Sequence, residues 1–244
     1  MNLFDQCRDP GTSPERLAEI AGDPCLHPTI GRQLARNPSV PERELLRLGQ
    51  EFPAELLQNP LWDLWMLADP GFLDRLPLRT AMSLAGCDAT PTAVIRRLAG
   101  ARSRPVPVRA RAACNPSTPP ELLHDYMKHA REVRRALATN PRLDPRLHPR
   151  LARDSWSPVR GAIAARRDID PALLVKLASD RSVEHVRAAV AGNPRTPARI
   201  LLRLCNSTAG SVLHAIAANR GAPDALRARA RTNGRAAWCG LTRI

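Results

Sequence analysis

Arginines at a fixed spacing are the residues of this chain best suited to chemistry, and that chemistry is anion binding. Each stands six residues before the end of a short Ala-rich segment, and the four segments follow one another along the chain. A guanidinium binds carboxylates and phosphates through paired hydrogen bonds and stays charged at physiological pH. The spacing therefore predicts an arginine column that could bind an anionic partner. Its members are Arg109, Arg134, Arg160 and Arg187.

A structural role within the fold is the alternative for these arginines. In several copies an aspartate precedes the arginine, at the predicted end of the preceding helix. These pairs are Asp23 before Arg32, Asp154 before Arg160, and Asp180 before Arg187. The arginine could pair with the aspartate, or donate to the last carbonyls of the neighbouring helix, where a cation is favoured. The pattern favours the structural role and leaves the ligand-facing role open.

Charge is distributed unevenly along the chain. Residues 1–100 carry 10 basic and 13 acidic side chains, whereas residues 101–244 carry 27 basic and 10 acidic ones, a net charge of +17. A surface of that charge releases counterions when it binds a polyanion, so nucleic-acid backbone binding is an alternative function. Only Tyr126, Trp156 and Trp238 could stack on bases in this half, so sequence-specific readout is not expected. Further arginines that could add to a basic surface are Arg102, Arg104, Arg111, Arg135, Arg150, Arg195, Arg227, Arg229, Arg231 and Arg235.

Cysteine and histidine show no catalytic or metal-ligating pattern. The six cysteines lie far apart, unlike a secreted disulfide framework, and several occupy repeat positions that tolerate a small apolar side chain. The six histidines follow no metal-ligand spacing. No Ser/His/Asp order and no glycine-rich phosphate loop occurs. We therefore expect reduced thiols, no metal, no cofactor and no catalytic residues.

An enzyme similar in shape to helical-repeat DNA glycosylases is a third hypothesis. It would need an acidic residue and aromatic side chains that converge in a basic groove. The candidates Asp125, Tyr126 and Trp156 come from different repeat positions, so the sequence predicts that the protein is not an enzyme.

The arginine-bearing segments are copies of one repeat. Aligned on a terminal Asn, they place Ala two residues earlier and a β-branched residue seven residues earlier, and the spacings from Asn115 onward are 25, 26, 27 and 26 residues. Self-similarity of this kind is typical of a solenoid, in which each repeat packs only on its neighbours. The aligned positions, here called the Asn column, are Asn37, Cys87, Asn115, Asn140, Arg166, Asn193 and Asn219.

Each repeat is predicted to form two short helices. The first begins at Ser, Thr or Asp followed by Pro, because the polar side chain can cap free N–H groups and Pro fits the first turn. Thr118 and Glu121 form a capping-box pattern. The second helix ends at the Asn, because a residue before Pro avoids helical dihedral angles. The expected starts are Ser13-Pro14, Thr90-Pro91, Thr118-Pro119, Asp170-Pro171 and Thr196-Pro197.

This pattern resembles the leucine-rich repeat variant family. The segments EHVRAAVAGNPRTPARILLRL (184–204) and VRARAACNPSTPPELL (108–123) are close matches, and the resemblance covers most of residues 9–235, with its weakest part between about 50 and 80. It implies an all-α, right-handed solenoid of about 8–9 two-helix repeats, with alternating α and 3-10 helices. Some members carry an N-terminal iron–sulfur cluster. A cluster needs four thiolates, and this N-terminal region offers only Cys7 and Cys25, so none is expected here.

The sequence thus predicts a single solenoid over residues 1–244. Its expected parts are N-terminal repeats (1–49), degenerate repeats (50–104), regular repeats (105–220) and a degenerate C-terminal capping repeat (221–244), with a mobile basic tail as the alternative for the last part. Residues 1–10 lack an apolar run, and no window of 18 apolar residues occurs, so we expect a cytoplasmic protein that spans no membrane. The predicted function is a non-enzymatic scaffold that binds a macromolecular partner, in the first place another protein, on the solenoid surface.

Overall fold

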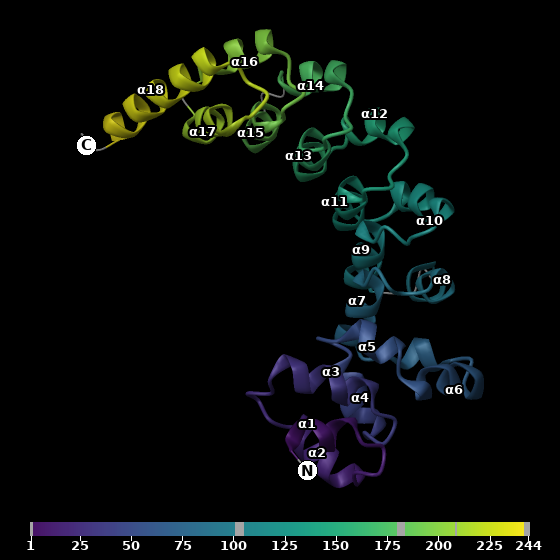
Figure 1. Ribbon diagram of the computed structural model, residues 1–244. Coiled ribbons are helices and arrows are strands. Elements are labelled where there is room, and N and C mark those ends of the chain that lie inside the picture. Colours follow the sequence, from purple (N-terminus) through teal and green to yellow (C-terminus); the bar gives the residue numbers. More distant parts are fainter. Residues whose placement is uncertain (1, 101–104, 180–183, 208, 242–244) are drawn as a thin grey trace. The chain divides into compact units, whose positions relative to one another are not determined.

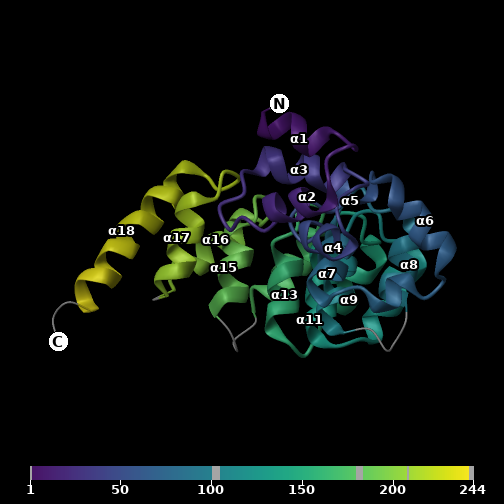
Figure 2. The same cartoon turned by 90° about the horizontal axis from the view of Figure 1, so that it is seen from below.

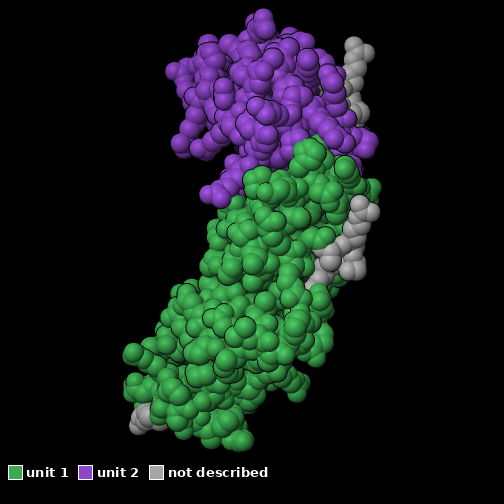
Figure 3. Space-filling view, turned by 90° about the vertical axis from the view of Figure 1, so that its right-hand side faces the viewer, with its two compact units in different colours: residues 1–133 green, residues 134–244 purple. Residues whose placement is uncertain are grey.

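A computed structural model describes residues 2–100, 105–179, 184–207 and 209–241 of the chain. These residues form α-helices, three short 3-10 helices and turns, and no strand occurs among them. The predicted all-α fold is therefore confirmed. The chain divides into two compact units, residues 1–133 (unit 1) and 134–244 (unit 2), which Figure 3 shows in two colours. The division into N-terminal, degenerate, regular and capping stretches stays a prediction.

In unit 1 the odd-numbered helices are the second helices of successive repeats. Contacts between α1 and α3, α3 and α5, α5 and α7, and α7 and α9 build a stack of neighbours, and the even-numbered helices form the other layer (Figure 1). The elements are α1 (Leu3–Arg8), α2 (Pro14–Ala21), α3 (Pro28–Arg36), α4 (Glu42–Leu48), α5 (Pro53–Leu57), α6 (Pro60–Ala68), η1 (Phe72–Arg75), α7 (Leu78–Gly86), α8 (Thr92–Gly100), α9 (Val106–Cys114), α10 (Pro120–Asp125) and η2 (Tyr126–Lys128).

Helix α11 (Arg131–Thr139) runs from the end of unit 1 into unit 2. In unit 2, α13, α15 and α17 stack as second helices, and α12, α14 and α16 form the other layer (Figure 1). Helix α18 packs beside α17 (Figure 2). The remaining elements are η3 (Pro145–Leu147), α12 (His148–Leu151), α13 (Ser157–Ala164), α14 (Pro171–Leu177), α15 (Glu184–Gly192), α16 (Ala198–Leu204), α17 (Gly210–Ala218) and α18 (Asp224–Leu241).

The expected alternation of α and 3-10 helices is the exception in this chain. A 3-10 helix occurs among the described residues only at η1, η2 and η3, and each adjoins or replaces the first helix of its repeat. In the other repeats the first helix is α. A first helix such as PALLVKL in α14 has straight-chain apolar residues and a capping Asp at its start, which favours full α-helical turns.

Alanine and β-branched residues at fixed repeat positions form the core. Ala35, Ala85, Ala113, Ala138, Ala164 and Ala191 are fully buried, and so are Val133, Val159, Val186 and Val212. Alanine lets stacked second helices approach closely, and the stiff Val side chain fills the space towards the first helix. Because each helix is so short, this stacking supplies most of the stability of the fold.

The polar residue before Pro has two different roles, of which the sequence predicts only one. Ser13 and Asp170 cap α2 and α14 as expected, by accepting from Arg16 N–H and Ala172 N–H. The threonines do not cap, and the capping box of Thr118 and Glu121 is wrong, because α10 begins one residue later and Pro119 is its N-cap. The buried Thr hydroxyls instead donate to a carbonyl near the end of the preceding second helix: Thr90 to Leu84, Thr118 to Ala112 and Thr196 to Val190.

The Asn column connects each repeat to the one before it. Asn193 Nδ2 donates to the carbonyls of Ala164 (2.7 Å) and Arg166 (2.6 Å), and its Oδ1 accepts from Arg195 N–H at 2.9 Å. One side chain therefore satisfies two carbonyls of the preceding repeat and holds its own turn. The same two donations are made by Asn37, Asn59, Asn115 and Asn219.

Asn59 is a member of the Asn column that the sequence alignment missed. Its Nδ2 donates to the carbonyls of Ala35 and Asn37, and its side chain is buried. The Asn59-Pro60 pair was a visible signal, but it follows Asn37 by only 22 residues and lacks the Ala two positions earlier. The structure shows that this shorter repeat keeps the interaction and loses the rest of the pattern.

We expect Asn59→Ala to lower the free energy of unfolding by about 2–4 kcal/mol, because two carbonyls and one N–H group lose their partner in a buried place. Urea unfolding followed by circular dichroism measures this. Gln58→Ala is the control, since Gln58 is an exposed amide beside it, and its effect should stay within about 0.5 kcal/mol. Equal effects of the two substitutions would contradict the role given to Asn59.

Candidate functional site

The arginine column lies at the beginning of the second helices, and Arg134 forms its best-defined contact. Its Nε and Nη2 donate to the two carboxylate oxygens of Asp154 at 2.6 Å and 3.0 Å. The Asp154 side chain is 7% exposed. Burial by itself raises the pKa of Asp154, but hydrogen bonds from Arg134 and from the Trp156 N–H, with the charges of Arg134 and Arg160, outweigh burial and lower it. Arg134 therefore has a structural partner.

Arg109 also bonds within the chain. Its Nη1 lies 2.7 Å from His129 Nδ1, and His129 Nε2 lies 3.1 Å from Asp125 Oδ2. Nδ1 therefore accepts from the guanidinium, and the Nε2–H donates to the carboxylate. Tyr126 is buried, its OH donates to the Ala99 carbonyl, and burial raises its pKa. Asp125 and Tyr126 thus each have a partner within unit 1.

Arg160 donates to backbone carbonyls of the loop between α12 and its own helix, α13. Its Nη1 bonds the carbonyls of Asp154 (2.8 Å) and Ser155 (3.2 Å). The expected pairing of Arg160 with the Asp154 carboxylate is therefore wrong, since that carboxylate binds Arg134. These carbonyls belong to the loop between α12 and α13, so donation to the last carbonyls of a neighbouring helix does not describe the contacts either.

The structure does not show the other two expected pairs, Asp23 with Arg32 and Asp180 with Arg187. Arg32 lies 3.6 Å from Glu55, which is its partner in place of Asp23. Asp180 lies outside the described residues, and Arg187 has no ion-pair partner within them. Three members of the arginine column thus have partners within the chain. Binding of an anionic partner by Arg109, Arg134, Arg160 and Arg187 stays a prediction.

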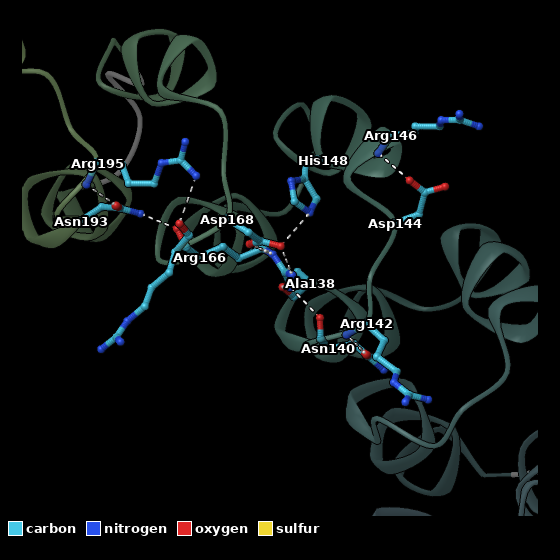
Figure 4. A network of polar contacts seen from close by, with 11 residues as sticks. Ala138, Asn140, Arg142, Asp144, Arg146, His148, Arg166, Asp168, Asn193 and Arg195 are labelled. Carbon is cyan, nitrogen blue, oxygen red and sulfur yellow. Dashed lines mark hydrogen bonds and ion pairs between the residues drawn. The ribbon is translucent and has the colours of Figure 1, made fainter.

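A cluster of polar side chains lies around Arg166 and Asp168 (Figure 4). Arg166 occupies the Asn column, and its Nη1 donates to the carbonyls of Ala138 (3.0 Å) and Asn140 (2.7 Å), as an Asn side chain would. Its Nε and Nη2 bind the carboxylate of Asp168 at 2.8 Å and 2.7 Å. These hydrogen bonds lower the pKa of Asp168. In this repeat, Arg166 therefore makes the two donations that an asparagine makes elsewhere, and Asp168 balances its charge.

His148 completes this cluster. It stands at a position that holds a buried Leu or Ile in neighbouring repeats, and it is 2% exposed. Its Nε2 lies 4.0 Å from Asp168 Oδ2 and has no hydrogen-bond partner in the part of the chain that the structure describes. Burial lowers the pKa of His148, the Arg166 charge lowers it further, and the charges of Asp168 and Asp144 oppose this only in part. The histidine is therefore held neutral in the core.

Hollows recur at the Asn-Pro turns of the second-helix layer. The Asn193 hollow, of about 450 Å³, is lined by Ala165, Arg167, Ala189, Gly192, Asn193, Pro194, Ala218 and Arg220. The Asn37 hollow in unit 1, also about 450 Å³, is lined by Phe4, Arg8, Pro10, Gln33, Arg36, Asn37 and Pro38. Both combine apolar residues with two arginines, although Arg167 and Arg220 follow positions of the Asn column and Arg36 precedes one. Sequence analysis missed them, because residues next to the Asn vary between copies.

The structure describes most of the further arginines that the sequence suggested for a basic surface. Arg111, Arg135, Arg150, Arg195, Arg229 and Arg231 have exposed side chains, and Arg227 is half-buried. Arg102 and Arg104 lie outside the described residues, as does the side chain of Arg235.

The cysteines are free in the described residues, and Cys7 and Cys205 are fully buried. Burial raises the pKa of both thiols. No group of three or more His, Cys, Asp or Glu in the described ranges is arranged to hold a metal ion. None of the described helices has the length and hydropathy needed to cross a membrane.

Arg134→Ala should lower the free energy of unfolding by about 1–3 kcal/mol, because the largely buried Asp154 loses a charge-assisted partner. The loss should be present above the ordinary Asp pKa, about 3.9, and should shrink as the pH falls below it, because Asp154 titrates at a lower pH in the native protein. Chemical unfolding across pH measures it. The exposed neighbour Arg135 provides the control Arg135→Ala, and a loss of similar size there would argue against the structural pair.

His148→Leu should stabilise the protein, and more so at acidic pH. The native state resists protonation of His148, so stability falls as the pH drops through the ordinary histidine pKa of about 6.5. Leucine removes this pH dependence. It also removes the buried polar nitrogen, which lowers the stability of the native protein by about 1–3 kcal/mol. Unfolding midpoints at pH 7.5 and 5 compare the variant with His214→Leu, an exposed histidine. An unchanged pH dependence in His148→Leu would contradict this account.

Comparisons with known proteins support the architecture. The family described as Leucine Rich Repeat Variant domain matches residues 108–167, and the family described as Leucine rich repeat variant matches residues 184–207. No curated protein and no solved structure matches the chain. The matched segments contain all four members of the arginine column and the regular part of the Asn column. Residues 108–167 and 184–207 are thus similar to leucine-rich repeat variant repeats, as the resemblance in the sequence predicted.

Proposed function

We propose that the chain is a non-enzymatic scaffold that binds an acidic segment of a protein partner along the hollows at the Asn-Pro turns. The observation that carries this proposal is the recurrence of one kind of hollow in both units, at Asn37 and at Asn193, each with two arginines at its edge. The Asn193 hollow is lined by residues of three successive repeats, so it suits an extended ligand segment that contacts those repeats.

The lining of the Asn193 hollow explains the preferred ligand. Ala165, Ala189, Gly192 and Ala218 are small, so a partner backbone can approach the helix ends closely. The guanidiniums of Arg167 and Arg220 have no ion-pair partner among the described residues, and they can bind acidic side chains of the approaching segment. Small apolar walls with charged edges are typical of peptide-binding sites.

Exposed leucines of unit 1 also favour a protein partner. Leu64 and Leu67 are one helical turn apart on α6 and are 57% and 80% exposed. Neighbouring apolar side chains at a surface are typical of protein contacts and contribute nothing to phosphate binding.

Nucleic-acid backbone binding is the second candidate function, and the charge of the C-terminal half favours it. Unit 2 carries 21 basic and 7 acidic residues. Such binding would weaken steeply as salt rises, because bound counterions are released from the phosphates. Three members of the arginine column have partners within the chain, so the exposed arginines outside the column would carry most of these contacts.

The double substitution Arg167→Glu/Arg220→Glu should weaken binding of acidic peptides about tenfold or more, because two favourable charges become repulsive. Gly192→Leu should also weaken binding, since its side chain would fill the hollow, and its Cβ would meet only Ala215 Cβ at 3.8 Å. Fluorescence anisotropy with a set of labelled acidic peptides measures both, with a 20-mer duplex and its single strand alongside at several salt concentrations.

Lys176→Glu/Arg199→Glu is the matched control. It changes the net charge equally but alters exposed residues of α14 and α16, in the other helical layer. Peptide binding that survives the control and fails in the hollow variants supports the proposal. Peptide binding that both double variants weaken equally would refute the hollow as the site. Duplex binding with a steep salt dependence, and no peptide binding, would make nucleic acid the partner.

A further inference from the structure

Arg187 lacks the contact that two other members of the arginine column, Arg109 and Arg134, make within the described residues. In two earlier repeats the column arginine contacts the residue twenty positions later: Arg109 contacts His129, and Arg134 contacts Asp154. The same step from Arg187 leads to Ser207. A neutral side chain therefore stands where Arg187 would find its partner.

Ser207 keeps the local turn of Asp154 and lacks its charge. The Ser207 Oγ accepts from the Ala209 N–H at 3.1 Å, as the Asp154 carboxylate accepts from the Trp156 N–H at 2.8 Å. The backbone position is thus retained, while the second carboxylate oxygen and the negative charge are missing.

A hollow of about 340 Å³ occupies this place. Arg187 and Arg203 both line it. Arg187 Nε is buried and has no hydrogen-bond partner among the described residues, and Arg203 Nη2 makes one long hydrogen bond, 3.5 Å, to Ser179 Oγ. Neither arginine pairs with a carboxylate in the described residues. The other residues of the lining are Ala178, Ser179, Leu204, Asn206 and Ser207.

The electrostatics of this hollow favour an anion. A guanidinium nitrogen that is removed from water without an acceptor is unfavourable, and an incoming oxygen would offset that cost. A third guanidinium lies close by, since Arg229 Nη2 donates to Asn206 Oδ1 at 3.0 Å. No acidic residue is part of the described lining.

We propose that Arg187 and Arg203 bind one carboxylate of the acidic protein partner, in the place that Asp154 fills for Arg134. This inference rests on the proposed scaffold function and names the group that one repeat recognises. The Arg134–Asp154 pair gives the expected geometry, with Nε and Nη2 each donating to one carboxylate oxygen. Arg203 would supply the second positive charge from the facing helix α16.

Substitution Ser207→Asp tests the site by supplying the carboxylate from within the chain. The probe is a blocked tripeptide with one aspartate, titrated into the full-length protein while the Arg Nε–H signals are followed by nuclear magnetic resonance. In the wild type the Arg187 signal should shift and saturate. In Ser207→Asp, binding of the probe should be about tenfold weaker or absent, and the melting temperature should rise by about 2–4 °C.

Thr232→Asp is the matched control, because it adds the same charge at an exposed site of α18 outside the hollow. It should bind the tripeptide as the wild type does. Arg187→Ala should abolish the shift of the remaining Arg203 signal. Equal binding by Ser207→Asp and wild type would overturn the proposal, and this result does not depend on whether Arg187→Ala folds.

Two further arms separate this site from other possibilities. A phosphoserine tripeptide and inorganic phosphate are titrated in parallel, and binding of these without binding of the aspartate probe would overturn the carboxylate assignment. The Arg167→Glu/Arg220→Glu variant should bind the aspartate tripeptide normally, since its substitutions lie in a different hollow. The two proposals can therefore fail separately. If the acidic peptides do not bind at the Asn-Pro hollows, but wild type and Arg167→Glu/Arg220→Glu both bind the aspartate tripeptide, only the proposed function is refuted.

Discussion

The donation of two hydrogen bonds by one buried asparagine to the repeat before it is the interaction on which the rest of this structure depends. Each second helix ends after about two turns, and its last carbonyls would otherwise face the core without partners. The Asn193 amide satisfies the carbonyls of Ala164 and Arg166 and fixes its own turn through Arg195 N–H. Repetition of this bond holds neighbouring repeats in register, so that the buried Ala and Val positions can pack.

The exception at Arg166 shows what the interaction requires. A guanidinium reaches the same two carbonyls, but it brings a charge into a place that is neutral elsewhere. Asp168 compensates this charge, and His148 replaces an apolar side chain beside the pair. A buried ion pair can replace a neutral amide here because Nε, Nη1 and Nη2 of Arg166 all find acceptors and Asp168 balances the charge.

The members of the arginine column also need a partner for their charge, and they differ in whether the chain provides one. Arg134 has a carboxylate twenty residues later, Asp154, and this pair connects the start of the second helix α11 to the turn that follows the first helix α12. Arg187 has Ser207 at the corresponding position, and its buried Nε has no hydrogen-bond partner among the described residues. The proposed site at Arg187 follows from this difference, because there the partner would supply the carboxylate that Asp154 supplies to Arg134.

The sequence alone determined the helical repeat, the buried Ala and Val positions and the end of each second helix at Asn, because these depend on local dihedral preferences and on a period that every copy repeats. It did not reveal Asn59, the hollows or the partner of each arginine. Those depend on which side chains of adjacent repeats meet, and spacing within one repeat carries no information about contacts across the stack. Thr118 illustrates this: its Pro neighbour suggested a helix cap, but the tertiary structure gave its hydroxyl a buried carbonyl of the preceding helix instead.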